Sequence, residues 1–276
     1  MIATKQVPGA NHLHSSVYRL SSIVYRLSSI VYRLSSIVYR RPTSGTKEHV
    51  MKEPRVMLAG GGGADDSRQL DTIFAAWTGR SGRMLYLPIA MGDNPSTDYD
   101  SALEWVSGVF RPFGVGEIEM WTRLEGHTQE ELSDFDSVYI GGGNTFLLMD
   151  RLRSSGFDHY LAEYVEQGGA VYGGSAGAVV LGRNVLTASR HDPNDVALTD
   201  TRGLDLVGGH AIWVHYRAED DPLIYEYIHK YMIPVLALSE RGGVGVEAGR
   251  VIAWGHEPVY RFTRRRKREI KPGEQV

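Results

Sequence analysis

The sequence predicts an α/β fold in which a mostly parallel sheet is flanked by helices on both faces. Between residues 55 and 175, short apolar runs alternate with segments of helical periodicity. Two of these runs lead into glycine-rich turns, at 141–143 and 173–177. Ligands of parallel sheets bind at the carboxyl ends of the strands, so we expect both turns at the same, functional edge.

The elements before Ser175 follow from local pattern. Apolar runs predict strands at 55–59, 84–88, 117–121, 138–140 and 170–172. Helical spacing of apolar residues predicts helices at 65–77, 99–110, 146–153 and 157–166. Asp65 and Asp66 are suited to begin the first of these helices.

After Ser175 the pattern changes to shorter elements. We expect a short helix at 178–181, a strand at 211–216 that includes His215, and a helix at 221–231. Four short strands are predicted at 235–238, 243–246, 251–254 and 259–262. The charge run at 264–268 is interpreted as a solvated tail.

Composition restricts the class of protein. The chain has 276 residues, 42% hydrophobic and 23% charged, which is typical of a globular protein with one large domain or two small ones. A net charge of −3 gives no reason to expect a nucleic acid partner. The chain has no cysteine, which excludes thiolate metal sites and a cysteine nucleophile and fits a cytoplasmic location. No apolar run has the length of a membrane span, so no membrane partner is expected.

Residues 1–50 differ from the rest because VYRLSSI occurs three times without change from Val17. The amphipathic period of seven allows a coiled-coil seam, a membrane-surface helix or a basic presequence. Packing fixes only the buried stripe, yet the polar positions are also identical, which favours a duplicated stretch of coding DNA. We therefore expect 1–50 to be a disordered or non-native extension, with a second start at Met51 and one folded catalytic domain over 51–276.

The segment around Ser175 carries the pattern G-x-S-x-G of a nucleophile elbow, with glycine at 173 and 177. Such a turn is too tight for flanking Cβ atoms and holds the serine in a strained conformation. It leaves the hydroxyl above the sheet, close to helix N-terminal amides that can receive an oxyanion. The alternative is a glycine turn without chemistry.

The glycines at 60–63 raise a second possibility, a nucleotide-phosphate loop. Asp66 stands where the dinucleotide pattern requires glycine, and no Gly-Lys-Ser/Thr follows. We therefore interpret 60–63 as a loop over an active site.

A serine hydroxyl needs a general base, and the base needs an acid that orients it. His215 is the best base among ten histidines, because it ends an apolar strand and can point out of the carboxyl edge. The residues alone leave four acids open: Asp192, Asp195, Asp200 and Asp205. The sequence contains no H-E-x-x-H, and neither a metal nor a cofactor is expected.

Two motifs together resemble a known family. Ile140-Gly141-Gly142-Gly143-Asn144-Thr145-Phe146-x-Leu148 is followed, about thirty residues on, by Gly174-Ser175-Ala176-Gly177-Ala178. The pair is similar to the peptidase E (aspartyl dipeptidase) and cyanophycinase family of serine peptidases, over roughly residues 53–262. This resemblance implies a class I glutamine amidotransferase-like, three-layer fold.

The resemblance also implies roles for individual residues. Ser175 would be the nucleophile, His215 the base and Asp195 the acid. The amides of Gly143 and Ala176 would form the oxyanion hole, beside Asn144 at the substrate. Peptidase E carries a Gly-Glu-Thr-Arg segment whose arginine binds the aspartate of the substrate, and this segment is absent after His215. Arg217 and Arg190 are the arginines that could replace it.

The function expected is that of a serine exopeptidase that hydrolyses small peptides, with an N-terminal aspartate as one possible preference. An α/β-hydrolase esterase shares the elbow, but its acid comes after further strands, whereas here base and candidate acids lie within forty residues of the serine. A binding module without turnover is the third interpretation, against which the intact serine and histidine argue.

Overall fold

The structure is a computed structural model that describes residues 53–92 and 96–276. The predictions made for residues 1–50 lie outside the described residues. No helix in the described part of the chain is both long and apolar enough to cross a membrane.

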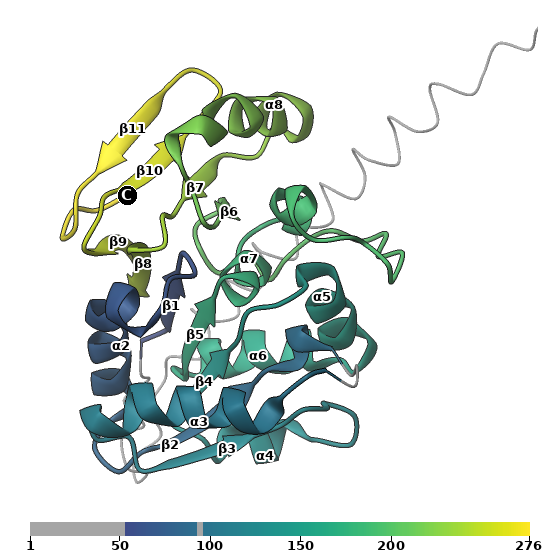
Figure 1. The fold of residues 1–276 in the computed structure, drawn as a ribbon, viewed down its shortest axis with the longest axis vertical. Helices are drawn as coiled ribbons and strands as arrows, with labels where there is room; N and C mark the ends of the chain where they lie inside the picture. The colour runs from purple at the N-terminus through teal and green to yellow at the C-terminus, as the bar shows by residue number, and fades with distance from the viewer. Residues whose placement is uncertain (1–52, 93–95) are drawn as a thin grey trace, which may run out of the picture. The chain divides into compact units, whose positions relative to one another are not determined.

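A seven-stranded sheet forms the centre of the described chain (Figure 1), in the order β3-β2-β4-β5-β1-β8-β9. Its first five strands are parallel, and β8 and β9 are antiparallel additions at one edge. The strands are β1 (Arg55–Ala59), β2 (Arg83–Leu87), β3 (Glu117–Met120), β4 (Ser137–Ile140), β5 (Ala170–Gly174), β8 (Gly242–Glu247) and β9 (Arg250–Gly255).

Helices cover both faces of this sheet because successive strand side chains point to opposite sides. Met57 packs with Phe74 of α2 and Phe110 of α3, whereas Leu58 packs with Phe146 of α5 on the other face. The predicted α/β class with a mostly parallel, doubly covered sheet is therefore confirmed. The helices are α2 (Ala64–Thr78), α3 (Tyr99–Phe110), α4 (Gln129–Ser133), α5 (Thr145–Ser154), α6 (Phe157–Glu166), α7 (Ala176–Leu181) and α8 (Asp221–Tyr231), with short 3-10 turns η1 (Ile89–Met91), η2 (Arg111–Phe113), η3 (Val185–Arg190) and η4 (Ala218–Asp220).

A second sheet has four strands in the order β11-β10-β7-β6 (Figure 1), and along the chain these strands lie on either side of β8 and β9. It has its own core, in which Ile224 and Ile228 of α8 pack against Trp213 and Phe262. Its strands are β6 (Ala211–Trp213), β7 (Val235–Ala237), β10 (Val259–Phe262) and β11 (Lys267–Ile270).

The interpretation of 264–268 as a solvated tail is wrong at its C-terminal end. Strand β11 starts at Lys267 and pairs antiparallel with β10. The Lys267 ammonium lies 4.5 Å from the ring centre of Tyr260 and 2.8 Å from a carboxylate oxygen of Asp221. A lysine can pack its aliphatic stem on aromatic rings while its charge is paired, so a basic run is compatible with a strand.

Candidate active site

Ser175 lies at the turn between β5 and α7 and has a positive φ of 51° with ψ −111°, a conformation that is strained for a residue with a side chain. Its backbone N–H donates to the carbonyl of Ala59 at 3.2 Å, which fixes the turn to β1. A Cβ at Gly177 would lie 2.3 Å from the carbonyl oxygen of Ile140, and one at Gly173 would lie 2.5 Å from the backbone of Gly177. The predicted tight turn from strand to helix is thus present, and its glycines are required by contact with the backbone.

His215 brings an imidazole to this serine. Its Nε2 lies 2.8 Å from Ser175 Oγ, within hydrogen-bond distance. Strand β6 ends at Trp213, two residues before His215. The backbone of His215 has a φ of 50°, and its N–H donates to the carbonyl of Gly60 at 2.9 Å. A Cβ at Gly61 would lie 2.3 Å from the imidazole Cε1, so the glycine loop after β1 borders the ring directly. The serine–histidine pair and the loop over it were both expected from the sequence.

Glu240 contacts the other side of the imidazole, with Oε1 3.2 Å from Nδ1. β6 and β7 are parallel, with Trp213 opposite Ala237, so the segments that follow them leave the sheet at the same end. His215 and Glu240 lie on these two segments. The sequence pattern could have indicated Glu240 as a candidate acid, because it follows an apolar run just as His215 does.

Asp195, expected as the acid, is not at His215; Glu240 occupies that position. The loop that carries Asp195 is attached to the start of α5 instead. Asp192 accepts a hydrogen bond from the N–H of Thr145 at 2.8 Å, and the Asn144 amide donates to the carbonyl of Pro193 at 2.8 Å. This attachment leaves Asp195 exposed. Of the other candidate acids, Asp200 pairs with Arg153 and Arg202, and Asp205 pairs with Arg183.

The glycine turn after β4 lies beside the serine. A Cβ at Gly142 would be 3.8 Å from Ser175 Oγ. Gly143 has φ 138°, and a Cβ there would be 2.3 Å from the carbonyl oxygen of Ala90 in η1. Asn144 begins α5, with its Oδ1 accepting from Leu147 N at 2.9 Å. Its side chain therefore caps a helix and holds the 191–195 loop, and its role at the substrate stays a prediction.

A pocket of about 160 Å³ opens next to Ser175 between α2, α3 and the sheet edge. Aromatic and hydroxyl groups line it together with glycines: Ala59, Gly61, Gly62, Ser67, Tyr86, Trp105, Tyr139, Gly141, Gly142, Tyr172, Gly174 and Ser175. Burial raises the pKa of Tyr86 to about 12, and burial also places the pKa of Tyr139 and Tyr172 well above the usual value. All three phenols are therefore neutral at physiological pH.

Asp71 of α2 lies behind this pocket and is 2% exposed. Its two oxygens accept hydrogen bonds from Ser67 at 2.8 Å and from Tyr172 at 2.9 Å. Burial raises its pKa to about 6, although both hydrogen bonds act in the opposite direction. Helical periodicity in the sequence gave no indication that this carboxylate would be buried against two residues of the pocket lining.

The arginines considered for substrate binding have other environments. Arg190 forms an ion pair with Asp220 at 3.3 Å and stacks on Trp213 with its guanidinium carbon 4.5 Å from the ring centre. It also donates to the carbonyl of Val214, next to His215. Burial lowers the pKa of Arg190. Arg217 is exposed, and neither arginine lines the pocket beside Ser175.

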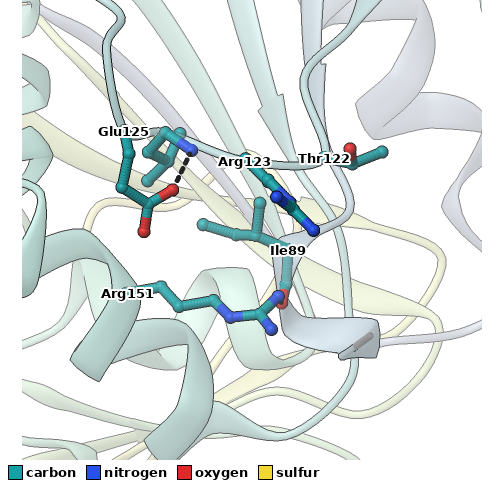
Figure 2. Close-up of a pocket in the computed structure, with 6 residues that line it drawn as sticks. Ile89, Thr122, Arg123, Glu125 and Arg151 are labelled. Carbon is teal, nitrogen blue, oxygen red and sulfur yellow. Dashed lines mark hydrogen bonds between the residues drawn. The ribbon is translucent and has the colours of Figure 1, made fainter. Parts of the chain in front are cut away.

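A second pocket, of about 220 Å³, lies behind η1 (Figure 2). Figure 2 shows Arg123 and Arg151 reaching toward it on either side of Ile89. Arg151 donates to the carbonyl of Ile89 at 2.9 Å. The next residue, Ala90, accepts from Asn144 N at 2.9 Å. This pocket contains none of the groups around Ser175, and its wall at η1 is bonded to the glycine turn after β4 through Ala90 and Asn144.

Comparisons with known proteins place the chain in a family. The model of peptidase family S51 matches residues 56–253. Peptidase E of Streptomyces coelicolor is 25% identical over 207 residues, covering 71% of this chain and 80% of the relative. The Drosophila melanogaster protein named probable alpha-aspartyl dipeptidase is 27% identical over 200 residues, covering 68% of this chain and 78% of the relative. The crystal structure of a peptidase from an acI-B1 Actinobacterium shares the fold, with a TM-score of 0.65 at 17% identity over 82% of this chain and 97% of that one. The chain belongs to peptidase family S51.

Proposed function

We propose that the chain is a serine-type dipeptidase whose nucleophile is Ser175, whose general base is His215 and whose orienting acid is Glu240. The observation that carries the proposal is the continuous contact from Ser175 Oγ to His215 Nε2, at 2.8 Å, and from His215 Nδ1 to Glu240, at 3.2 Å. Membership of a peptidase family and relatives named as dipeptidases support the substrate class. A cysteine-free chain favours the cytoplasm as its location.

The geometry accounts for both the formation of the acyl-enzyme and its hydrolysis. His215 takes the proton of Ser175 as the oxygen attacks the peptide carbonyl. Glu240 holds the imidazole with Nε2 toward the serine and stabilises the imidazolium that forms. The amides of Gly143 and Ala176 would receive the oxyanion. His215 then gives its proton to the leaving amine, and water activated by the same imidazole hydrolyses the acyl-enzyme.

Turnover of dipeptides by the full chain tests this function. The release of free amino acids is measured on a panel of dipeptides with varied N-terminal residues, beside a p-nitrophenyl ester. We expect Ser175→Ala to lose several orders of magnitude in kcat/KM, because members of such a triad act as a unit. Ser133→Ala on α4 is the matched control and should leave the rate unchanged. Hydrolysis of the ester alone, or dipeptide turnover that survives Ser175→Ala, would overturn the proposal.

A further inference from the structure

The pocket beside Ser175 has the composition of a cation site. None of its lining residues carries a positive charge, and three of its walls are the aromatic rings of Tyr86, Tyr139 and Trp105. The faces of such rings are electronegative and attract ammonium and guanidinium groups. A carboxylate side chain would enter this pocket without a cation to pair with it, which is costly in a site of low dielectric constant.

Asp71 orients the hydroxyl groups of the pocket. An ionised carboxylate only accepts hydrogen bonds, so Tyr172 must direct its proton to Asp71. Ser67 has two acceptors, Asp71 at 2.8 Å and the carbonyl of Gly63 at 3.1 Å, and both lie outside the pocket lining. Both hydroxyls therefore present oxygen lone pairs to the pocket. The pocket then favours a group that donates hydrogen bonds and disfavours one that only accepts them.

Two further hydroxyls lack a protein partner. Tyr86 and Tyr139 are 4% and 7% exposed, and no hydrogen bond joins either hydroxyl to another group within the described residues. Both point to the catalytic edge, since a Cβ at Gly141 would lie 3.3 Å from the Tyr86 oxygen and one at Gly174 would lie 3.0 Å from the Tyr139 oxygen. Neither hydroxyl oxygen is among the buried atoms that lack a partner, so both are open to the pocket and available to hydrogen-bond a ligand group there.

Arg241, which contacts Asp66 beside the pocket, is already paired. Arg241 lies 3.3 Å from Asp66 and 3.9 Å from Glu257. Asp66 borders Gly62, a residue of the pocket lining. Arg190 is held by Asp220 and Trp213 and is not part of the lining. Asp66 is neutralised by Arg241, so the negative charge next to the pocket comes from Asp71, whose partners are the neutral hydroxyls of Ser67 and Tyr172.

We propose that this pocket selects a dipeptide with a basic side chain next to the scissile bond, of the lysine or arginine type, and rejects an acidic one. This inference rests on the proposed dipeptidase function. The aromatic walls and the outward-facing hydroxyl oxygens bind the cationic end, and Asp71 supplies the counter-charge through Ser67 and Tyr172. The stem of the side chain passes Trp105, which is 44% exposed at the rim.

Comparison of lysine with norleucine tests the proposal in the wild-type full chain, because the two side chains differ in little but the charge. The kcat/KM values are measured at pH 8 for Lys-Ala, Ala-Lys, Nle-Ala, Ala-Nle and Asp-Ala. We expect lysine to exceed norleucine by about tenfold or more in one of the two positions and Asp-Ala to be the slowest substrate. Equal or faster hydrolysis of the norleucine peptides in both positions, or preference for Asp-Ala, overturns the inference but leaves the dipeptidase intact. Absence of Ser175-dependent turnover on every peptide overturns both.

Two variants locate the preference in the pocket. Asp71→Asn keeps the shape of the side chain and should reduce the lysine-to-norleucine ratio to about one or two, with norleucine hydrolysis retained. Asp158→Asn on α6 makes the same charge change outside the pocket and should leave the ratio unchanged. Should Asp71→Asn fail to fold, Trp105→Ala at the exposed rim should reduce lysine hydrolysis, and Trp105→Phe should restore it. A ratio that survives both Asp71→Asn and Trp105→Ala contradicts the assignment.

Discussion

Replacement of Glu240 by glutamine is the sharpest perturbation of the candidate triad. Glutamine keeps the size of the side chain and removes the negative charge that lies 3.2 Å from His215 Nδ1. The imidazole then loses the partner that fixes its tautomer and stabilises its protonated form during attack. Ser175, 2.8 Å away on Nε2, keeps its own contact, so the effect should appear in kcat rather than in KM.

The size of the effect follows from the exposure of the pair. The Glu240 and His215 side chains are 52% and 34% exposed, so the effective dielectric constant lies well toward that of water. Two unit charges about 3.2 Å apart then interact by ~1.4 to ~2.7 kcal/mol, which corresponds to a ~10- to ~100-fold loss of kcat. A buried carboxylate in the same position would give a larger loss.

Asp195→Asn is the matched control for this prediction, since it removes one negative charge from an exposed loop near the site. Steady-state hydrolysis of the best dipeptide should give wild-type kcat for Asp195→Asn and the reduced kcat for Glu240→Gln. A large loss in Asp195→Asn with none in Glu240→Gln would refute the assignment of the acid and restore the one implied by sequence resemblance.

Two further predictions concern the oxyanion turn and the buried carboxylate. Gly143→Ala should lower kcat more than ~100-fold and lower Tm, because its Cβ would meet a backbone oxygen at 2.3 Å and its φ of 138° disfavours any side chain. Gly108→Ala in α3, with open space around it and no positive φ, is the control and should change neither; equal effects would refute the steric argument. Burial raises the pKa of Asp71 from 3.8 to about 6, so the folded chain favours the protonated carboxyl group. The stability that this burial leaves intact is fully present below pH 4, and it is lost as the pH rises through 6 and Asp71 ionises inside the fold. Urea titrations should show the unfolding free energy of wild type falling by about 3 kcal/mol relative to Asp71→Asn between pH 4 and pH 8, and a constant difference would contradict this.

The local pattern of the sequence was sufficient for the main sheet and its helices. The predicted helices at 99–110 and 157–166 match α3 and α6 because both have apolar residues at helical spacing and clear ends. The elbow at Ser175 was equally visible, because its glycines are dictated by backbone contacts within a few residues and with the adjacent strand. Such features depend on steric contacts between residues close together in the chain, and these can be predicted from the local sequence.

Glu240 and Asp71 could not be placed in the same way. Glu240 reaches His215 only because β6 and β7 pair in parallel, and strand pairing across the intervening helix α8 is not encoded by local periodicity. In the sequence, Asp71 has the pattern of an exposed polar position on an amphipathic helix. In the fold it is buried against Tyr172, which lies on a strand about a hundred residues later in the chain. Strand β11 was missed for a related reason, since the charge of Lys267 is neutralised by Asp221 from a distant helix.

Covalent labelling tests most directly whether Ser175 is an activated nucleophile. The full chain is treated with a small organophosphonate, and the site of modification is determined by peptide mass spectrometry alongside the loss of dipeptide hydrolysis. We expect one modified peptide, which contains Ser175, a loss of activity in proportion to labelling, and much slower labelling in His215→Ala. Full dipeptide hydrolysis by a chain completely labelled at Ser175, or by Ser175→Ala, would contradict this expectation.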